Sequence, residues 1–182
     1  MRIISGKYKG KRFDVPHTFK ARPTTDFAKE SLFNILQNNY VDFDEQPAAL
    51  DLFAGTGSIS LEFVSRGCNR VVCIEKDFKH WQFLRKICGE LGDAAWKPLH
   101  GDVFKFLKGQ RADHFDIIFA DPPYALENLS DIPRCVFEAN ILAPDGIFVL
   151  EHGKDYDFTN DPQFLEHRNY GSVNFSFFGN KS

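Results

Sequence analysis

Short apolar runs alternate with helical patterns along most of the chain after about residue 48. Continuous apolar runs predict buried strands at 48–53, 70–75, 115–120 and 146–151, and a shorter strand at 98–102. Helical spacing of apolar positions follows at 58–67, 78–91, 103–107 and 129–142. This alternation is typical of a doubly wound, Rossmann-like α/β fold with a mostly parallel sheet.

Both ends of the chain depart from this alternation. Near the N-terminus, Gly6 and Gly10 punctuate two short apolar runs, which predicts a small β-hairpin. A helix is expected after it, with Thr24 as N-cap and Asp26 in its first turn. Residues 166–178 read as two strands around Gly171, expected to form an antiparallel C-terminal edge of the sheet. We therefore predict one domain, 1–182, in which residues 1–22 are a hairpin appendage and residues 23–182 the core.

Composition changes this picture little. The chain has 182 residues, 43% hydrophobic and 26% charged, which is ordinary for a globular domain with a sizeable core. It has no apolar window of about 18 residues and no apolar secretory signal, so we expect a cytoplasmic protein without membrane association. The four cysteines form no C-x-x-C pair and the six histidines show no ligand-like pairing. Free thiols, no metal site and a monomer are the expectations.

Charge is unevenly distributed along the chain. Residues 1–22 hold seven basic side chains and one acidic, a net charge of +6, whereas residues 23–182 carry −9. A basic leading segment on an acidic body suggests a local contact with a polyanion. The alternative is a solvated basic tail.

The first strand of the alternating region runs into a glycine loop, AGTGSIS. Gly55 and Gly57 lack Cβ atoms, so backbone N–H groups there can approach a ligand closely. Ser60 stands where a dinucleotide fingerprint has its third glycine, which argues against a nicotinamide or flavin but leaves a nucleoside-type ligand open. Taken alone, the loop is equally consistent with a structural turn.

Acidic residues end the next two strands. Glu75 closes the strand 70–75, where an acid accepts hydrogen bonds from ribose hydroxyls in doubly wound nucleotide sites. Asp102 follows the third strand and could meet an adenine amino group. The alternative is a pair of solvated acids, but ligands bind at the carboxyl ends of parallel strands, where these positions should meet.

The fourth strand ends in Asp121-Pro122-Pro123-Tyr124. The prolines hold an extended turn, so a turn carbonyl and the Asp121 carboxylate can each accept a hydrogen bond from a planar exocyclic amine. Tyr124 can stack on the base that carries this amine. Such acceptors would aim the nitrogen lone pair at an electrophile, which is catalysis by positioning and electrostatics. A plain proline turn is the alternative.

The order of these motifs resembles that in class I S-adenosyl-L-methionine (AdoMet)-dependent methyltransferases that act on exocyclic amines. The motifs are DLFAGTG, Glu75, Asp102 and DPPY. RIISGKYKGKRFDVP followed by RPTTDFAKESLFNIL resembles the opening of the bacterial RsmD family, which methylates the N2 of a guanine in small-subunit (16S) ribosomal RNA. The resemblance covers nearly the whole chain. DPPY alone is shared with DNA and RNA adenine methylases, whereas the leading combination is more specific.

The resemblance implies roles for particular residues. Gly55 and Gly57 would face the methionine part of AdoMet, Glu75 its ribose, and Asp102 with the Val103 backbone its adenine. Thr24 and Thr25 would cover the amino-acid end of AdoMet, and Asp121 to Tyr124 would hold the guanine. The further implied cofactor-binding residues are Asp51, Phe53, Ala54, Thr56 and Lys76. The implied partner is 16S rRNA within the small subunit or an assembly intermediate, contacted through Arg2, Lys7, Lys9, Lys11, Arg12 and Arg22 while the target base is flipped out.

One position departs from the family pattern. Lys29 stands where an arginine usually precedes the glutamate, and a lysine would bind a phosphate or carboxylate less well because it cannot make the paired hydrogen bonds of a guanidinium.

Several other functions compete with this assignment. An adenine-N6 methyltransferase acting on DNA or RNA shares the DPPY chemistry. A glutamine methylase would more typically have Asn where Asp121 stands, and cytosine-C5 chemistry needs a nucleophilic cysteine in an active-site turn. A catalytically silent RNA-binding protein of this fold would show decayed motifs.

Overall fold

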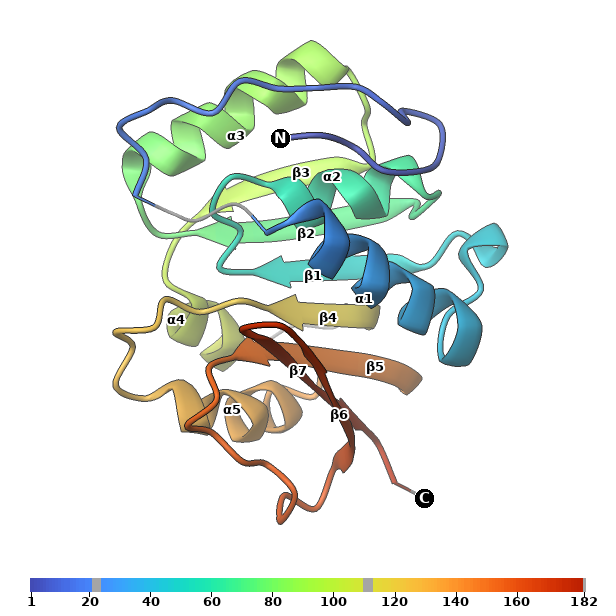
Figure 1. Ribbon diagram of the computed structural model, residues 1–182, viewed down its shortest axis with the longest axis vertical. Coiled ribbons are helices and arrows are strands. Elements are labelled where there is room, and N and C mark those ends of the chain that lie inside the picture. Colours follow the sequence, from blue (N-terminus) through green and yellow to red (C-terminus); the bar gives the residue numbers. More distant parts are fainter. Residues whose placement is uncertain (21–23, 110–112, 182) are drawn as a thin grey trace.

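A seven-stranded sheet forms the centre of the computed structural model, which describes residues 1–20, 24–109 and 113–181 (Figure 1). The strand order is β3-β2-β1-β4-β5-β7-β6. The first five strands in this order are parallel, and β7 and β6 are antiparallel additions at one edge. The predicted doubly wound architecture with an antiparallel C-terminal edge is confirmed. The strands are β1 Ala48–Leu52, β2 Arg70–Glu75, β3 Trp96–His100, β4 Phe115–Ala120, β5 Leu142–His152, β6 Phe164–Tyr170 and β7 Val173–Gly179.

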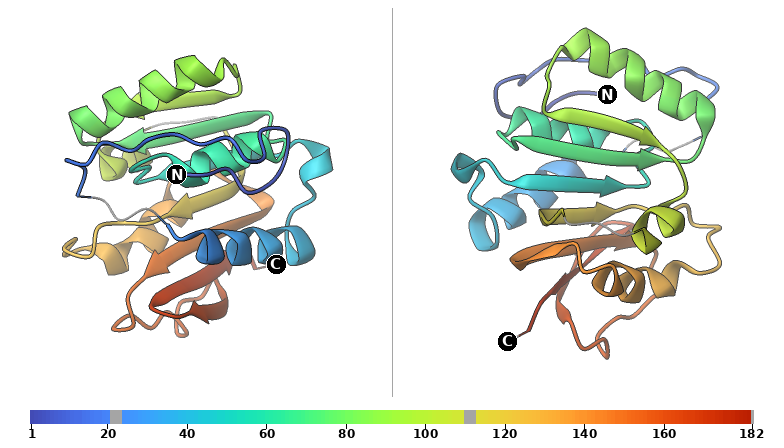
Figure 2. Two further views of the ribbon diagram at one scale, coloured as in Figure 1. Left: turned by 45° about the horizontal axis from the view of Figure 1, so that its top comes forward. Right: turned by 180° about the vertical axis from the view of Figure 1, so that it is seen from behind.

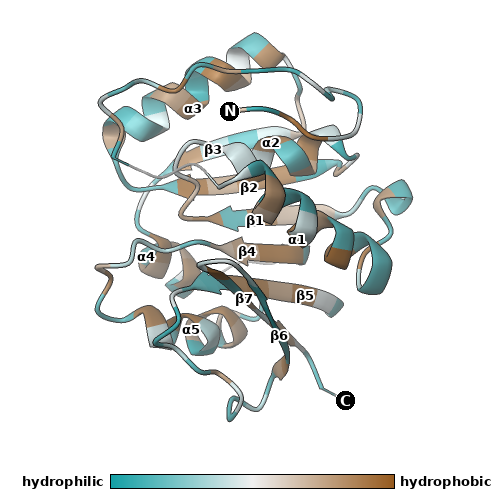
Figure 3. Cartoon of the chain, viewed as in Figure 1, coloured by the Kyte–Doolittle hydropathy of each residue, from teal (hydrophilic) through white to brown (hydrophobic). Residues whose placement is uncertain are grey.

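Helices cover both faces of the sheet (Figure 2). Strand residues alternate between two buried clusters, one shared with α1, α2 and α3 and the other with α4 and α5. In β4, for example, Phe119 belongs to the first cluster and Ala120 to the second. Figure 3 shows the central strands β4 and β5 as predominantly hydrophobic, as expected for strands covered on both faces. The helices are α1 Asp26–Asn39, α2 Ser58–Ser65, α3 Phe78–Leu91, α4 Val103–Lys108 and α5 Ile132–Glu138, with 3₁₀ turns η1 Phe43–Glu45 and η2 Leu129–Asp131.

Capping side chains set where these helices begin. The Thr25 hydroxyl accepts a hydrogen bond from the Ala28 N–H at 3.2 Å, so the N-cap of α1 is one residue later than the predicted Thr24. Asp77 caps α3 and Asp102 caps α4 in the same way. Because the Asp102 carboxylate caps α4, it stabilises the connection between β3 and α4 in addition to any contact with a ligand.

The predicted helix 129–142 is wrong at its end. It divides into η2 and α5, and α5 stops at Glu138. Asn140 adopts a left-handed conformation with φ of 54°, and Leu142 already belongs to β5, which pairs with β4 across an irregularity near Phe115. The strand thus starts at residue 142, earlier than the predicted 146.

The N-terminal segment forms a turn-rich hairpin without regular strands. Its arms meet in one isolated antiparallel bridge, Arg2 to Arg12, and the Ile3 N–H donates to the Lys11 carbonyl at 3.0 Å. Ile3 and Phe13 are buried against the core, so the arms are held by packing rather than by a β-ladder. The turn is attached to the C-terminal end of α2, where the Lys7 N–H donates to the Ser65 carbonyl at 2.8 Å. Within the described parts of the chain, no helix is long and apolar enough to span a membrane.

Candidate functional site

The carboxyl ends of the parallel strands form one edge of the sheet, toward which the arrows of β1 and β4 point in Figure 1. Five acidic residues lie at this edge, each in a different strand or within two residues of its end. They are Asp51 in β1, Glu75 at the end of β2, Asp102 after β3, Asp121 after β4 and Glu151 in β5. The structure therefore brings together the strand-end acids that the sequence pointed to, and it adds Glu151.

The loop after β1 is pinned to the end of β2. The Ala54 N–H donates to the Ile74 carbonyl at 2.9 Å, and the Gly55 N–H donates to Glu75 Oε2 at 2.8 Å. Phe53 has φ of 58°, a conformation that non-glycine residues rarely adopt and that clusters at functional sites. The loop is thus held in one defined shape at the strand edge.

The two glycines of this loop have different surroundings. A Cβ on Gly57 would lie 2.7 Å from Leu84 Cδ2, so this glycine allows α2 to pack closely against α3. A Cβ on Gly55 would meet no atom within 4 Å. Both have positive φ, of 84° and 56°. Gly55 is therefore the position where a ligand can approach the backbone, and Gly57 is required mainly by packing.

Asp51 and Ser60 connect β1 to α2 beneath the loop. Both are buried, and the Ser60 hydroxyl donates to Asp51 Oδ2 at 2.6 Å. Burial raises the pKa of Asp51 to about 7, although the hydrogen bond from Ser60 acts in the opposite direction. The serine in place of a third glycine thus has a specific partner. Ala54 and Thr56, two residues of the same loop, are also buried.

Glu75 is an oriented acceptor at the next strand end. Its Oε2 accepts from the Gly55 N–H, and its Oε1 accepts from the Asp77 N–H at 3.0 Å. A carboxylate held by two backbone donors keeps lone pairs free for further donors such as hydroxyl groups. The exposed ring of Phe78, three residues later, contacts Trp81 and His100, whose ring centroids stack 5.2 Å apart.

Asp102 faces the same region from the end of β3. It accepts from the Lys105 N–H at 3.0 Å, and the exposed Lys76 ammonium lies 3.5 Å from its Oδ2. Val103, the first residue of α4, is buried. Oriented carboxylates, an exposed aromatic ring and an open glycine therefore follow one another along this edge, a set that suits a nucleoside with a polar tail.

The DPPY segment leaves β4 as an extended turn. Pro122 is buried and Pro123 exposed, and the Leu126 N–H donates to the Pro123 carbonyl at 3.0 Å. The Tyr124 ring is 68% exposed and lies beside Gly153, which follows β5. Burial raises the pKa of Asp121 to about 7. A carboxyl that changes charge near neutral pH thus stands beside a ring that is free to stack.

Glu151 is the residue that the sequence reasoning missed. The residue is only 8% exposed, and its Oε2 has no hydrogen-bond partner among the described residues. Burial, and after it the Asp121 carboxyl, raises its pKa to about 9. Its position could have been found from the sequence, because GIFVLE ends in an acid in the same way as RVVCIE, whose last residue is Glu75.

The basic hairpin lies mostly away from this edge. Lys7 pairs with Asp93 at 2.7 Å, and the Tyr8 hydroxyl donates to the same carboxylate, which follows the C-terminal end of α3. Because α2 and α3 begin at the carboxyl edge, their C-terminal ends lie at the opposite edge, about 12 Å away along α2. Figure 1 shows the hairpin turn on that far side.

The other predicted RNA-contacting residues have varied surroundings. Arg2 pairs with Asp26 at 2.8 Å at the start of α1, close to Thr24 and Thr25. Lys9, Lys11 and Arg12 are exposed. Arg22 lies outside the described residues. The structure does not gather these cations at the DPPY segment.

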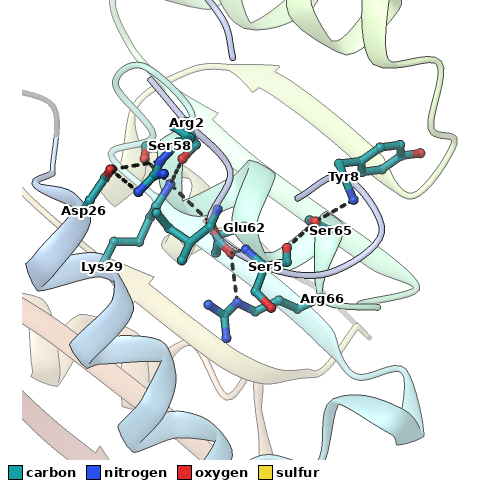
Figure 4. Close-up of polar contacts among 10 residues, drawn as sticks. Arg2, Ser5, Tyr8, Asp26, Lys29, Ser58, Glu62, Ser65 and Arg66 are labelled. Carbon is teal, nitrogen blue, oxygen red and sulfur yellow. Dashed lines mark hydrogen bonds and ion pairs between the residues drawn. The ribbon is translucent and has the colours of Figure 1, made fainter. Parts of the chain in front are cut away.

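A buried ion cluster joins the N-terminal segment to α1 and α2 (Figure 4). The Lys29 ammonium donates to the Arg2 carbonyl at 2.7 Å and to the Ser58 hydroxyl at 3.0 Å, and lies 3.2 Å from Glu62 Oε1. Glu62 also accepts from the Ile4 and Ser5 N–H groups and from Arg66. Lys29 therefore binds a carboxylate inside the protein and is not available to an external phosphate.

Comparisons with known proteins match this chain over nearly its full length. The family model described as Conserved hypothetical protein 95 matches residues 1–179. Ribosomal RNA small subunit methyltransferase D of Haemophilus influenzae is 30% identical over 185 residues, covering 99% of this chain and 94% of that protein.

Solved structures match as well. "Putative methyltransferase yhhF" from Escherichia coli has a TM-score of 0.84 at 28% identity, covering 98% of this chain and 96% of that one. An RNA methyltransferase of Salinibacter ruber in complex with S-adenosyl-L-homocysteine has a TM-score of 0.64 at 19% identity, covering 86% of this chain and 92% of that one, and shows the fold alone.

Proposed function

We propose a function from one premise: the chain belongs to the family described as Conserved hypothetical protein 95, the RsmD family. It is an AdoMet-dependent methyltransferase that acts on ribosomal RNA. The atom to which it transfers the methyl group is, in our proposal, the exocyclic N2 of a guanine in 16S rRNA. The observation that carries the proposal is the half-buried Asp121 carboxyl with the exposed Tyr124 ring, at the same strand edge as the Gly55–Glu75 pair.

The residues of the strand edge fit AdoMet. Glu75, fixed by two backbone N–H groups, would accept hydrogen bonds from ribose hydroxyls. The open side of Gly55 leaves room for the methionine part, and Thr24 and Thr25 lie at the start of α1 to cover its end. Asp102 and Val103 would meet the adenine, with Phe78 as an exposed aromatic neighbour. When bound, AdoMet supplies an electrophilic methyl group.

Asp121 and Tyr124 act on the target base. Tyr124 stacks on the guanine ring, and Asp121 accepts a hydrogen bond from the N2 amine, which directs the nitrogen lone pair toward the methyl group. As the nitrogen gains the methyl group and the cofactor leaves as S-adenosyl-L-homocysteine, the amine proton would become acidic and would pass to the Asp121 carboxylate and from there to water. Because burial raises the Asp121 pKa to about 7, the group is a better proton acceptor than an ordinary carboxylate while still part-ionised at neutral pH.

We further propose how the RNA is presented. The target base must leave its stack in the RNA to reach the site, which lies at the carboxyl edge of the protein sheet. A single methyltransferase domain of 182 residues has little surface for reading sequence, so the small subunit or an assembly intermediate would present the target to a monomeric, cytoplasmic enzyme. The exposed Lys9, Lys11 and Arg12 would contact phosphates at a distance from the target base.

A labelling experiment tests this function. The protein is incubated with methyl-labelled AdoMet and either unmethylated small subunits, naked 16S rRNA or duplex DNA, and labelled nucleosides are identified after digestion. We expect label in N2-methylguanosine, lost with Asp121→Ala. Label in N6-methyladenine would keep the DPPY chemistry but overturn the proposed target atom. No label on any substrate, with AdoMet binding intact, would favour a silent RNA-binding protein.

A further inference from the structure

Two carboxyl groups stand side by side where β4 and β5 end. The two strands are parallel, and Ala120 of β4 is in register with Leu150 of β5, so Asp121 and Glu151 are the next residues on neighbouring strands. Ala120 and Leu150 both belong to the cluster on the α4–α5 side. Because side chains alternate along a strand, Asp121 and Glu151 both turn to the opposite side, where α1 and α2 lie.

Within the described part of the chain, no hydrogen-bond partner accounts for a second acid at this place. Glu151 is more than nine-tenths buried, and its Oε2 has no hydrogen-bond partner among the described residues. Its partner across the antiparallel pair is Phe175, which is fully buried and offers an apolar side chain. Burying a carboxyl oxygen without a hydrogen-bond partner is costly, so it calls for an explanation, and a ligand that supplies the missing donor is one.

We propose that Glu151 is a specificity-determining residue that accepts the N1–H of the target guanine, beside the contact between Asp121 and the N2 amine. This inference rests on the proposed function. Guanine carries two adjacent donors on one edge, the ring N1–H and the exocyclic amine, and two neighbouring carboxyl groups match them. Adenine carries one exocyclic amine beside a ring N1 that is itself an acceptor, so it would place two acceptors against each other.

The charge of the pair is compatible with this role. Burial raises the pKa of both groups, and the neighbouring Asp121 carboxyl raises that of Glu151 further, so the pair retains a proton over the neutral range. A proton shared between Asp121 and Glu151 leaves an acceptor oxygen on each group for the base. Asp121 remains the group that receives the amine proton, and Glu151 selects the ring that carries the amine.

A substituted base tests whether Glu151 recognises the N1–H group of guanine or only supports the structure of the site. 2-Aminopurine keeps the exocyclic amine but has an unprotonated N1 acceptor. Small subunits are reconstituted with guanine or 2-aminopurine at the position found to be methylated, and kcat/KM is measured for wild type, Glu151→Gln and Glu127→Gln. Glu127 is an exposed acid on the same connection after β4 and serves as the matched control.

We expect wild type and Glu127→Gln to prefer guanine over 2-aminopurine by about 100-fold, the order seen when a buried polar group loses its partner. Glu151→Gln should lower this ratio about tenfold or more, because the amide can rotate to donate to the N1 acceptor. AdoMet affinity within about threefold of wild type shows that the variant is folded.

Two results would overturn the inference in distinguishable ways. If Glu151→Gln slows both substrates equally and leaves the ratio unchanged, Glu151 does not read N1–H, and the proposed function stands. If the wild type methylates no guanine at all, the proposed function fails and the inference fails with it.

Discussion

Replacing Glu62 by alanine is expected to destabilise the protein and release its N-terminal segment. Glu62 is fully buried on α2, where it accepts from two N-terminal backbone N–H groups and contacts Lys29 and Arg66 (Figure 4). Its removal leaves a 1%-exposed Lys29 ammonium without its carboxylate and two N–H groups without their acceptor.

The expected loss is about 4 kcal/mol in the free energy of unfolding. Removing one partner of a buried ion pair costs roughly 3–5 kcal/mol, since the remaining charge stays buried. Burial already lowers the pKa of Lys29 while Glu62 opposes this, so in the variant the lysine would lose its proton more readily. This neutralisation limits the loss and keeps the estimate within that range.

Urea denaturation at pH 7 measures this loss, with Glu90→Ala, an exposed glutamate on α3, as control. Hydrogen exchange should rise selectively at the Ile4 and Ser5 amides. The double variant Lys29→Met, Glu62→Leu should recover part of the lost stability, because it removes both members of the pair. A loss below about 1 kcal/mol for Glu62→Ala, similar to a surface substitution, would refute the reasoning.

Three further predictions follow from the same structure. Charge reversal of Lys9 and Lys11 should weaken RNA binding and flatten its dependence on salt with AdoMet affinity unchanged, and an unchanged salt slope would remove the hairpin from the RNA-binding surface. The free energy of unfolding of the ligand-free protein should fall as pH rises from about 5 to 9, because the folded-state pKa values of Asp121 and Glu151 are raised above those of the unfolded chain, so stability present at low pH is lost as these groups are forced to ionise. Glu151→Gln should flatten this slope by up to about 1 kcal/mol per pH unit, and parallel curves would contradict the assignment. Gly57→Ala should destabilise the protein by about 1–3 kcal/mol, since the new Cβ would lie 2.7 Å from Leu84 Cδ2, whereas Gly55→Ala, which meets no atom within 4 Å, should cost less stability but weaken AdoMet binding; calorimetry that gives equal effects for both would count against their separate roles.

Strand-to-helix periodicity was enough to predict the central sheet. Parallel strands buried on both faces appear as uninterrupted apolar runs, and acids directly after such runs necessarily meet at one edge. For that reason the positions of Glu75, Asp102 and Asp121 could be inferred without coordinates. The Ser60–Asp51 bond could not, since it depends on how α2 packs against β1.

Two other features depended on tertiary contacts that local pattern does not contain. The N-terminal hairpin has strand-like arms in the sequence, yet burial of Ile3 and attachment to Ser65 replace the β-ladder. Lys29 stood out in the sequence as a lysine in place of an arginine. Its compact ammonium contacts a carbonyl, a hydroxyl and a carboxylate in three directions, a geometry that suits an ammonium better than a planar guanidinium.

The central claim is that the Asp121 carboxyl holds the amine that receives the methyl group and accepts the proton that the amine loses. The most direct test compares Asp121→Asn with wild type for single-turnover methyl transfer to unmethylated small subunits and for AdoMet affinity. We predict that transfer falls by about 100-fold or more while the AdoMet Kd stays within about threefold, because the amide keeps the shape of the side chain but accepts the amine proton poorly. Transfer at the wild-type rate, or a loss of transfer explained entirely by weaker AdoMet binding, would contradict the account.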